Sequence, residues 1–486
     1  AGHSTSAEPV TAQQTRYPHP LIDRYASAEM TDVFSPLRQA LTWRDLWIAL
    51  AEVERELGVP IPDEAIAELR AGREAVDLER IAEIEANLRH DVMAHVHHYG
   101  EVAPGARPFI HLGATSAYVA DNAGLIQLRD ALAVTRERLM AVISALASFA
   151  EQWRDLPTLG YTHWQPAQPV TVGKRATLWL QDFVADLEQV VELETELKFR
   201  GARGTTGTEA TFLELFDGDG ERVDALNERL AERFGFAGVW DVVGQTYPRK
   251  FDHRVLSVLA GIGTSTARFG QDVRLLQSFG EIEEPFGKSQ IGSSAMPYKR
   301  NPMRCERACS LARHLCTLEL DAAWTASVQG FERTLDDSAN RRIAIPEAFL
   351  CADAILLIVD NVASGLVVHE AVIESRLDRA LPFLVTEQVL IAGVRKGGDR
   401  QELHERVREH AMAARERLDS GSYDNDFFQR VAGDPEFGLT MDELMGLSRA
   451  EDLVGRSAVQ VEKYLGDRVR PLLEGYSGAS APRLRV

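Results

Sequence analysis

Residues 121–152 read DNAGLIQLRDALAVTRERLMAVISALASFAEQ, and this stretch decides the fold class of the chain. Large apolar side chains recur along it at spacings of three, four or seven residues, at Leu125, Leu128, Leu132, Leu139, Val142, Leu146 and Phe149. That spacing is typical of a long helix with one apolar face, as in a coiled coil. At ~1.5 Å of rise per residue, the helix would be about 48 Å long.

The same periodicity continues on both sides of this stretch. A helix is predicted at 42–58, with Thr42 as its N-cap and Gly58 after its end. Four more long helices are predicted, at about 172–199, 251–279, 302–328 and 344–363. Five long helices favour a bundle, and an apolar stripe this long suggests that subunits associate through it. No sustained strand pattern is found, although a small hairpin is possible at 201–213, so the fold is predicted to be mostly α.

The length of 486 residues exceeds what one hydrophobic core usually organises, so several domains are expected. The first twenty residues are polar and lack the apolar segment of a signal peptide. Changes in the character of the sequence place domain boundaries near residues 112 and 365. The predicted division is a disordered tail at 1–20, a helical domain at 21–112, a central bundle domain at 113–364 and a helical C-terminal domain at 365–486.

Charge and cysteine content narrow the class of protein. The net charge of -20 argues against nucleic acid or an anionic membrane as a partner, and no segment is apolar enough to span a bilayer. The four cysteines, Cys305, Cys309, Cys316 and Cys351, form no CxxC pattern. Their spacing favours buried, reduced thiols over zinc ligands or disulfides, which suits a cytoplasmic protein. There is no GxGxxG, and GTTGT at 204–208 lacks the rest of a P-loop.

The segment GSSAMPYKRNP, at 292–302, interrupts the helical pattern with small residues, hydroxyls and cations. We interpret Asn301 as an N-cap and Pro302 as the first helical residue, which puts Lys299 and Arg300 at a helix N-terminus that favours an anion. Two interpretations stay open at this point. The segment is either a capped surface loop, or a mobile loop that closes over an anion and brings Ser293 or Ser294 to it.

Other polar connectors carry histidines and arginines. Arg333, Ser338, Arg341 and Arg342 form either a solvated charge run or a pocket for a phosphate or carboxylate. His163 is either structural or a proton donor. The histidines at 90, 95, 97 and 98 match no standard metal-ligand spacing, so no metal is expected. Several cations, histidines and hydroxyls without a nucleotide loop suggest proton-transfer chemistry on a polyanion, such as elimination or isomerisation.

Read together, these segments resemble the fumarase/aspartase superfamily. GSSAMPYKRNP resembles its signature loop, here 282–302, and the MPYKRNP variant is similar to the adenylosuccinate lyases, especially those of animals. The same resemblance is carried by RYASAEM (24–30), RHDVMAHVH (89–97), HLGATS (111–116), PTLGYTHWQPAQ (157–168), GTTGT, GQTYPRK (244–250) and FERTLDDSANRR (331–342). It implies a mostly α fold of three domains with a central long-helix bundle. It also implies a homotetramer in which that bundle has twenty helices, and no metal or organic cofactor.

The resemblance implies a carbon–nitrogen lyase of purine biosynthesis. Adenylosuccinate would give AMP and fumarate, and the succinyl-carboxamide ribotide SAICAR would give AICAR and fumarate. Ser293 corresponds to the general base and His163 to the general acid, with His90 in support. Lys299 and Asn301 would hold the succinyl carboxylates. The other matched positions would bind substrate: Arg24, Tyr25, Arg89, Asp91, Thr115, Ser116, Gln245, Arg307, Arg333, Ser338 and Arg342. The segments around His111–Ser116, His163 and Ser293 would meet from three subunits.

A serine base is unexpected from residue type alone, which would favour a histidine. A serine alkoxide requires a closed loop in which Lys299 and backbone N–H groups lower the pKa of the hydroxyl. Two alternatives remain open: another fumarate-releasing lyase of the superfamily, such as argininosuccinate lyase, or a homologue that keeps the fold without activity.

Overall fold

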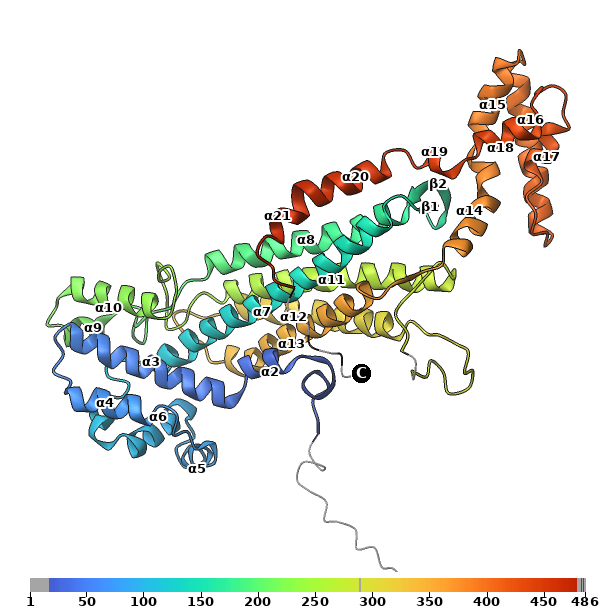
Figure 1. The fold of residues 1–486 in the computed structure, drawn as a ribbon. Coiled ribbons are helices and arrows are strands. Elements are labelled where there is room, and N and C mark those ends of the chain that lie inside the picture. The colour runs from blue at the N-terminus through green and yellow to red at the C-terminus, as the bar shows by residue number, and fades with distance from the viewer. Residues whose placement is uncertain (1–16, 288–289, 479–481, 483, 485–486) are drawn as a thin grey trace, which may run out of the picture.

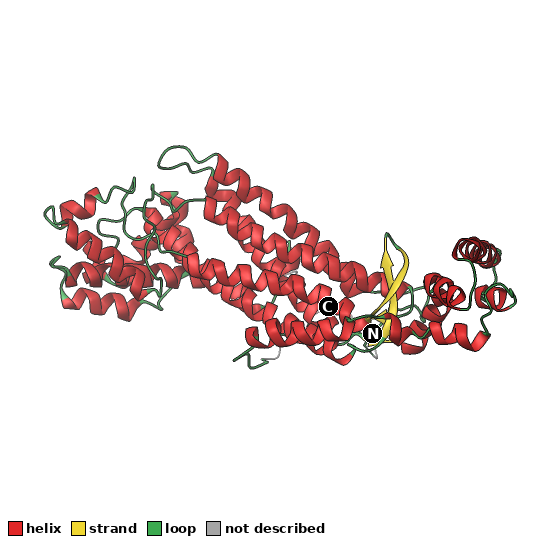
Figure 2. Ribbon diagram, turned by 90° about the horizontal axis from the view of Figure 1, so that it is seen from above, coloured by secondary structure: helices red, strands yellow, loops and turns green. Residues whose placement is uncertain are grey.

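The computed structural model describes residues 17–287, 290–478, 482 and 484. Five long helices form its centre and run side by side along an elongated molecule (Figures 1 and 2). They are α7 (Ser116–Gln152), α8 (Val172–Glu196), α11 (Lys250–Ser278), α12 (Met303–Ser327) and α13 (Asp337–Ala363). The prediction of a mostly α fold around a long-helix bundle is confirmed.

The apolar stripe of α7 is buried within one chain. All seven of its predicted apolar side chains belong to a single core, and α7 packs against α8 and α13. The argument that so long a stripe needs a partner subunit to cover it is therefore wrong, because neighbouring helices of the same chain already do so.

Helix ends differ from the predictions where side chains find partners outside the helix. α3 (Pro36–Glu56) begins after Ser35, whose hydroxyl accepts the Arg38 N–H at 3.2 Å. Thr42 is therefore not an N-cap: it lies inside α3 and donates its hydroxyl to the Arg38 carbonyl at 2.8 Å. α13 begins at Asp337, seven residues before the predicted start, because Asp337 and Arg341 in its first turns have buried partners.

The hairpin is found at a different place from the one expected. β1 (Pro157–Thr162) and β2 (Gln165–Thr171) pair antiparallel between α7 and α8. The two residues at its tip, His163 and Trp164, have φ of 51° and 60°, which is the geometry of a tight hairpin turn. Pro166 and Pro169 hide this strand from sequence patterns. Residues 201–209 form an irregular segment with bends, which a short helix, α9 (Ala210–Leu215), follows, so the hairpin expected at 201–213 is wrong. A second, two-residue pairing joins β3 (Ile282–Glu283) to β4 (Val367–Val368).

Smaller helices cover one end of the bundle, next to the start of α7 (Figure 1). They are α4 (Asp63–Gly72), α5 (Leu78–Leu88), α6 (Asp91–Val102), η2 (Pro104–Phe109) and α10 (Gly220–Arg233), together with α3 and α9. The chain enters through η1 (Leu21–Tyr25) and α2 (Ala28–Val33), which pack on α13. Of the tail expected at 1–20, residues 1–16 lie outside the described residues, and His19 hydrogen-bonds Glu347 at 2.9 Å.

The C-terminal helices form a second core at the other end. It joins α15 (Thr386–Arg395), α16 (Arg400–Asp419), α17 (Phe427–Ala432) and α18 (Met441–Leu447), and α14 (Glu370–Leu384) leads to it from the bundle. The chain then returns along α8 through α19 (Ala450–Leu453), α20 (Ser457–Tyr464), η3 (Leu465–Val469) and α21 (Arg470–Leu472). All four cysteines are free thiols, three of them buried and Cys316 half-buried. Among the described residues, no helix is long and apolar enough to cross a membrane.

The buried Glu54 of α3 predicts an unusual dependence of stability on pH. Its carboxyl is fully buried, neither oxygen has a hydrogen-bond partner among the described residues, and burial raises its pKa to about 9. Between about pH 4.5 and pH 9, the folded chain therefore holds a proton that the unfolded chain releases, so stability falls as pH rises. Glu54→Gln should remove this loss and raise the melting temperature at pH 8.5 more than at pH 5.5. The exposed Glu416→Gln is the control, and equal shifts at both pH values would contradict the prediction.

Candidate active site

A cavity of about 320 Å³ lies between α3, α7 and α13, at the end of the bundle covered by the small helices. Four of the predicted substrate-binding residues line it: Asp91, Arg333, Ser338 and Arg342. Arg342 reaches from α13 to Asp91 at the start of α6, with 2.6 Å between Nη2 and Oδ2. Segments 251 residues apart thus meet at one site.

The turn between α5 and α6 carries three predicted site residues, of which Asp91 lines this cavity. Arg89 closes α5 in the left-handed conformation, with φ 54°, and the chain then reverses into α6. His90 is the N-cap of α6, and its Nδ1 accepts the Met93 N–H at 3.3 Å. Burial raises the pKa of Asp91, but the Val92 N–H and Arg342 outweigh burial and hold it below its ordinary value. Asp91 is therefore charged and pairs with Arg342.

Three motif loops meet behind this cavity. The Gln245 side chain donates to the Thr205 carbonyl at 3.0 Å, and its backbone N–H donates to Glu332 at 2.8 Å. The contact is tight: a Cβ on Gly207, whose φ is 79°, would stand 1.9 Å from the Val243 carbonyl oxygen, so only glycine fits. Thr115 is at the N-cap position of α7, and Ser116 is the first residue of that helix.

A buried ion-pair network fixes the wall of the cavity. Arg249 lies between Asp121 and Asp337, at 2.9 and 2.7 Å, and all three side chains are buried. The other oxygen of Asp337 accepts Arg333 Nη1 at 2.7 Å, so this one carboxylate holds both guanidinium groups. Burial raises the pKa of Asp121, but the neighbouring Arg249 and Arg341 outweigh it and keep the carboxyl ionised.

Removing the charge of Asp337 should therefore destabilise the fold. Asp337→Asn removes one of the two carboxylates that pair directly with the buried Arg249, and breaking a buried pair costs about 3–5 kcal/mol. We expect a lower melting temperature and weaker substrate binding, since Arg333 also loses its partner. Asp419→Asn breaks an exposed pair with Arg415 and is the matched control, with a cost below about 1 kcal/mol. Equal melting temperatures for the two variants would show that the buried network contributes no more to stability than the exposed ion pair does.

A second group of predicted residues lies on the signature loop. Ser293 is half-buried, and its Oγ accepts the backbone N–H groups of Ala295 and Met296 at 3.3 and 3.1 Å. The loop folds back so that the backbone of Lys299 lies against Gly292, where a Cβ would stand 2.0 Å from the Lys299 oxygen. Lys299 thus returns to the neighbourhood of Ser293, and with Asn301 it lines a cavity of about 400 Å³.

The base of the loop corrects two predictions. Asn301 is not the N-cap of α12: its side chain donates to the Gly292 carbonyl at 2.6 Å, and Pro302 holds the cap position. Two of the first backbone N–H groups of α12 are already hydrogen-bonded, so they are not available to bind an anion. Those of Arg304 and Cys305 donate to the buried Glu284 at 3.0 and 2.9 Å.

Gln277 joins the two ends of the loop. Its side-chain oxygen accepts the Glu284 N–H at 3.1 Å, and its side-chain nitrogen donates to the Arg300 carbonyl at 3.0 Å. No sequence pattern marked Gln277, and Glu284 lies within the signature loop without having been predicted as a site residue. Next to α12, the ring of Tyr25 faces the guanidinium of Arg307 at 5.5 Å and that of Arg24 at 5.8 Å, which groups three more predicted residues.

His163 is apart from both groups. It is exposed at the tip of the β1–β2 hairpin, beyond the far end of α7 from Thr115 and Ser116. A helix of 37 residues is about 55 Å long, so the two ends of α7 cannot share one small substrate. In Figure 1 the hairpin and the signature loop lie on opposite sides of the end of α11. One chain therefore presents three separate groups of predicted residues.

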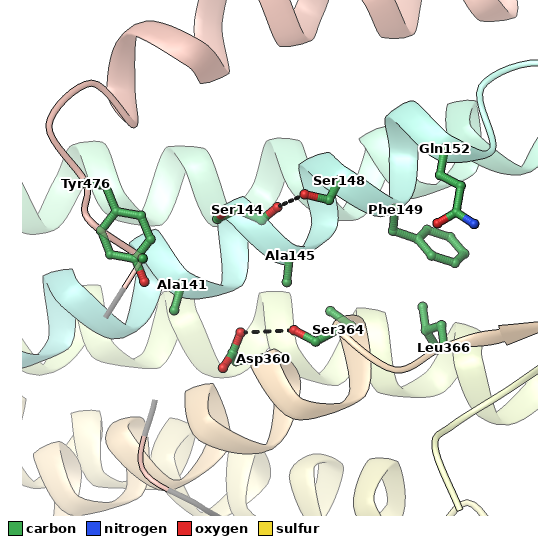
Figure 3. A pocket seen from close by; sticks show the side chains of 12 residues that line it. Ala141, Ser144, Ala145, Ser148, Phe149, Gln152, Asp360, Ser364, Leu366 and Tyr476 are labelled. Carbon is green, nitrogen blue, oxygen red and sulfur yellow. Dashed lines mark hydrogen bonds between the residues drawn. The ribbon is translucent and has the colours of Figure 1, made fainter. Parts of the chain in front are cut away.

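Two further features bear on the site. A cavity of about 440 Å³ lies between α7, α13 and the segment around Tyr476, lined in part by Ser144, Ser148 and Asp360 (Figure 3). No predicted site residue lines this cavity. Within the part of the chain that the structure describes, no group of three or more histidine, cysteine, aspartate or glutamate side chains is arranged to hold a metal ion.

Comparison with known proteins identifies the class. A family model described as Lyase matches residues 39–316, and a second, described as Adenylosuccinate lyase C-terminus, matches 382–464. The structure of a fumarate lyase from Mesorhizobium sp. BNC1 superposes with a TM-score of 0.78 at 26% identity, covering 92% of this chain and 99% of that one. A 3-carboxy-cis,cis-muconate lactonizing enzyme from Pseudomonas putida, at 24% identity and a TM-score of 0.82, shares the fold. The long-helix bundle is that of the fumarate lyase superfamily.

Sequence relatives narrow this to one family. The adenylosuccinate lyase of Saccharomyces cerevisiae is 50% identical over 95% of this chain and 96% of its own length. That of Schistosoma mansoni is 45% identical over 96% and 97%, and that of Pyrococcus abyssi is 32% identical over 82% and 87%. The chain belongs to the adenylosuccinate lyase family and is a carbon–nitrogen lyase.

Proposed function

We propose that this enzyme releases fumarate by β-elimination from adenylosuccinate, giving AMP, and from SAICAR, giving AICAR. The observation that carries the proposal is full-length similarity to adenylosuccinate lyases, combined with a cavity whose polar wall holds three arginines and a serine. Arg333 and Arg342 suit the phosphate of a nucleotide, because guanidinium groups bind phosphate oxygens in pairs. The list of substrate-binding residues given above belongs to this proposal.

In the proposed mechanism, Ser293 Oγ removes the proton beside a succinyl carboxylate. The C–N bond then breaks as the C=C bond of fumarate forms, and His163 gives its proton to the leaving nitrogen, so the protons balance. Two backbone N–H groups already point at Ser293 Oγ, and hydrogen bonds to the charged form of a group favour that form. Lys299 and Asn301 stabilise the negative charge that grows on the carboxylate, and His90 supports the acid.

We further propose a homotetramer whose sites combine residues from three subunits. The separation of the three residue groups in one chain supports this, since no single chain forms a complete site. Large apolar side chains also remain exposed where α12 ends and α13 begins, namely Leu320, Trp324, Phe331 and Leu335. Such a patch on a single chain marks an interaction surface. The three-domain division and a cytoplasmic location complete the proposal, with no organic cofactor or metal in the reaction.

Purified enzyme given each candidate substrate tests the proposed activity. Fumarate should be released from adenylosuccinate and from SAICAR, and not from argininosuccinate. Release only from argininosuccinate would make the enzyme a different lyase of the superfamily. No release from any of the three by a folded, assembled protein would identify it as an inactive homologue.

A further inference from the structure

His111 lies in the turn between η2 and α7, in a left-handed conformation with φ 66°. Its ring nitrogen Nδ1 accepts a hydrogen bond from the indole Nε1–H of Trp47 at 2.9 Å. Trp47 is on α3, is 1% exposed, and meets the imidazole edge-on, with ring centres 5.9 Å apart. The sequence showed HLGATS as a motif but gave no sign that Trp47 contacts it.

This contact fixes which nitrogen of His111 carries a proton. An indole N–H only donates, so Nδ1 must be unprotonated to accept it. The neutral imidazole then has its proton on Nε2, and an imidazolium, protonated on both nitrogens, would lose the bond to Trp47. Burial, reinforced by the nearby His90, lowers the pKa of His111 to about 4, in the same direction as the geometry.

We propose that Trp47 is a positioning residue that keeps His111 a neutral Nε2–H donor beside the substrate. This rests on the proposed function, because His111 begins the segment that ends at Thr115 and Ser116, and its neighbour His90 adjoins the Asp91–Arg342 pair. A neutral donor binds an anionic oxygen of the substrate without releasing a proton at neutral pH. His163 therefore faces no competing acid from this position.

Trp47→Phe removes the donor and keeps an aromatic ring. Hydrogen–deuterium exchange at the imidazole C2, followed by mass spectrometry, gives the titration midpoint of each histidine in the intact enzyme. We expect a wild-type midpoint for His111 below about pH 5 and a higher midpoint in the variant, which burial still keeps below about 6.5. Activity should change with the protonation of His111. In the variant, kcat/KM should fall about tenfold at pH 6 and less at pH 8, because a protonated His111 is an acid that competes with His163.

Trp179→Phe is the matched control. Trp179 is also 1% exposed and also donates its indole N–H to a side chain, Asp272, at 2.7 Å, but it lies on α8 within the bundle. The Trp179→Phe substitution should leave the titration midpoint of His111 and the shape of the pH profile of kcat/KM unchanged. An equal His111 midpoint in the wild type and in Trp47→Phe overturns the proposal. If Trp47→Phe fails to fold, the wild-type value decides, and a midpoint near 6.5 overturns it. Because exchange needs no substrate, failure of the proposed function would appear separately, as absent fumarate release.

Discussion

Ser293→Ala is expected to lower kcat for fumarate release about 1000-fold or more, with binding of the nucleotide substrate largely retained. Such a loss corresponds to about 4 kcal/mol of barrier, within the range for removal of a positioned base. The hydroxyl acts only while the proton is transferred, so its loss should appear in kcat far more than in KM. Single-turnover measurements with adenylosuccinate, beside equilibrium binding of the same substrate, separate the two effects.

Ser294→Ala is the matched control, since Ser294 is the adjacent, exposed hydroxyl of the same loop. It should retain most of the activity. If Ser293→Ala loses less than about tenfold, roughly 1.4 kcal/mol, another group is the base. If Ser294→Ala is instead the inactive variant, the loop presents the second serine and the assignment within the pair is reversed.

His163→Gln should also be inactive, and the two dead variants should restore activity to each other. In the proposed tetramer, His163 and Ser293 of one site come from different subunits. A mixed tetramer therefore contains sites in which one subunit supplies an intact histidine and another an intact serine. With equal amounts and random assembly, about a quarter of the sites are complete. Fumarate release after joint dissociation and reassembly should approach a quarter of the wild-type rate.

His404→Gln, an exposed histidine of α16, should stay fully active alone and controls for the substitution itself. Differently tagged chains that co-purify verify that subunits have exchanged. Exchange without any recovery of activity would mean that both residues come from one chain, and the shared-site architecture would be abandoned.

The helices were predictable because a helix with one buried face has apolar residues at regular intervals in its sequence. The apolar residues from Leu125 to Phe149 are spaced by three, four or seven positions, and the structure has one continuous helix there. The start of α13 was missed because Asp337 and Arg341 read as solvated charges, whereas each has a buried partner from a distant segment. The hairpin was missed because its two prolines remove the strand pattern.

Site residues were predictable as motifs but not as an arrangement. Arg342 and Asp91 stand in two recognisable segments, yet only the fold shows that they pair. Glu284 was not predicted to have a role, yet it accepts hydrogen bonds from the α12 N–H groups that the sequence analysis assigned to an anion. A local sequence pattern indicates where a helix begins and which backbone N–H groups lack a partner within the helix. Whether residues from other segments already accept hydrogen bonds from those groups is seen only in the structure.

Gln277 connects the two ends of the signature loop through its hydrogen bonds to Glu284 and Arg300, which has a consequence for how the length of the loop can evolve. Because both ends of the loop are held against the bundle, the packing of the helices does not depend on how many residues the loop contains. Lengthening a closed loop costs little, about 0.6 kcal/mol for each doubling. Selection on the length of this segment therefore comes from catalysis and hardly from folding, since an inserted residue would move Ser293 away from its substrate while leaving the bundle intact.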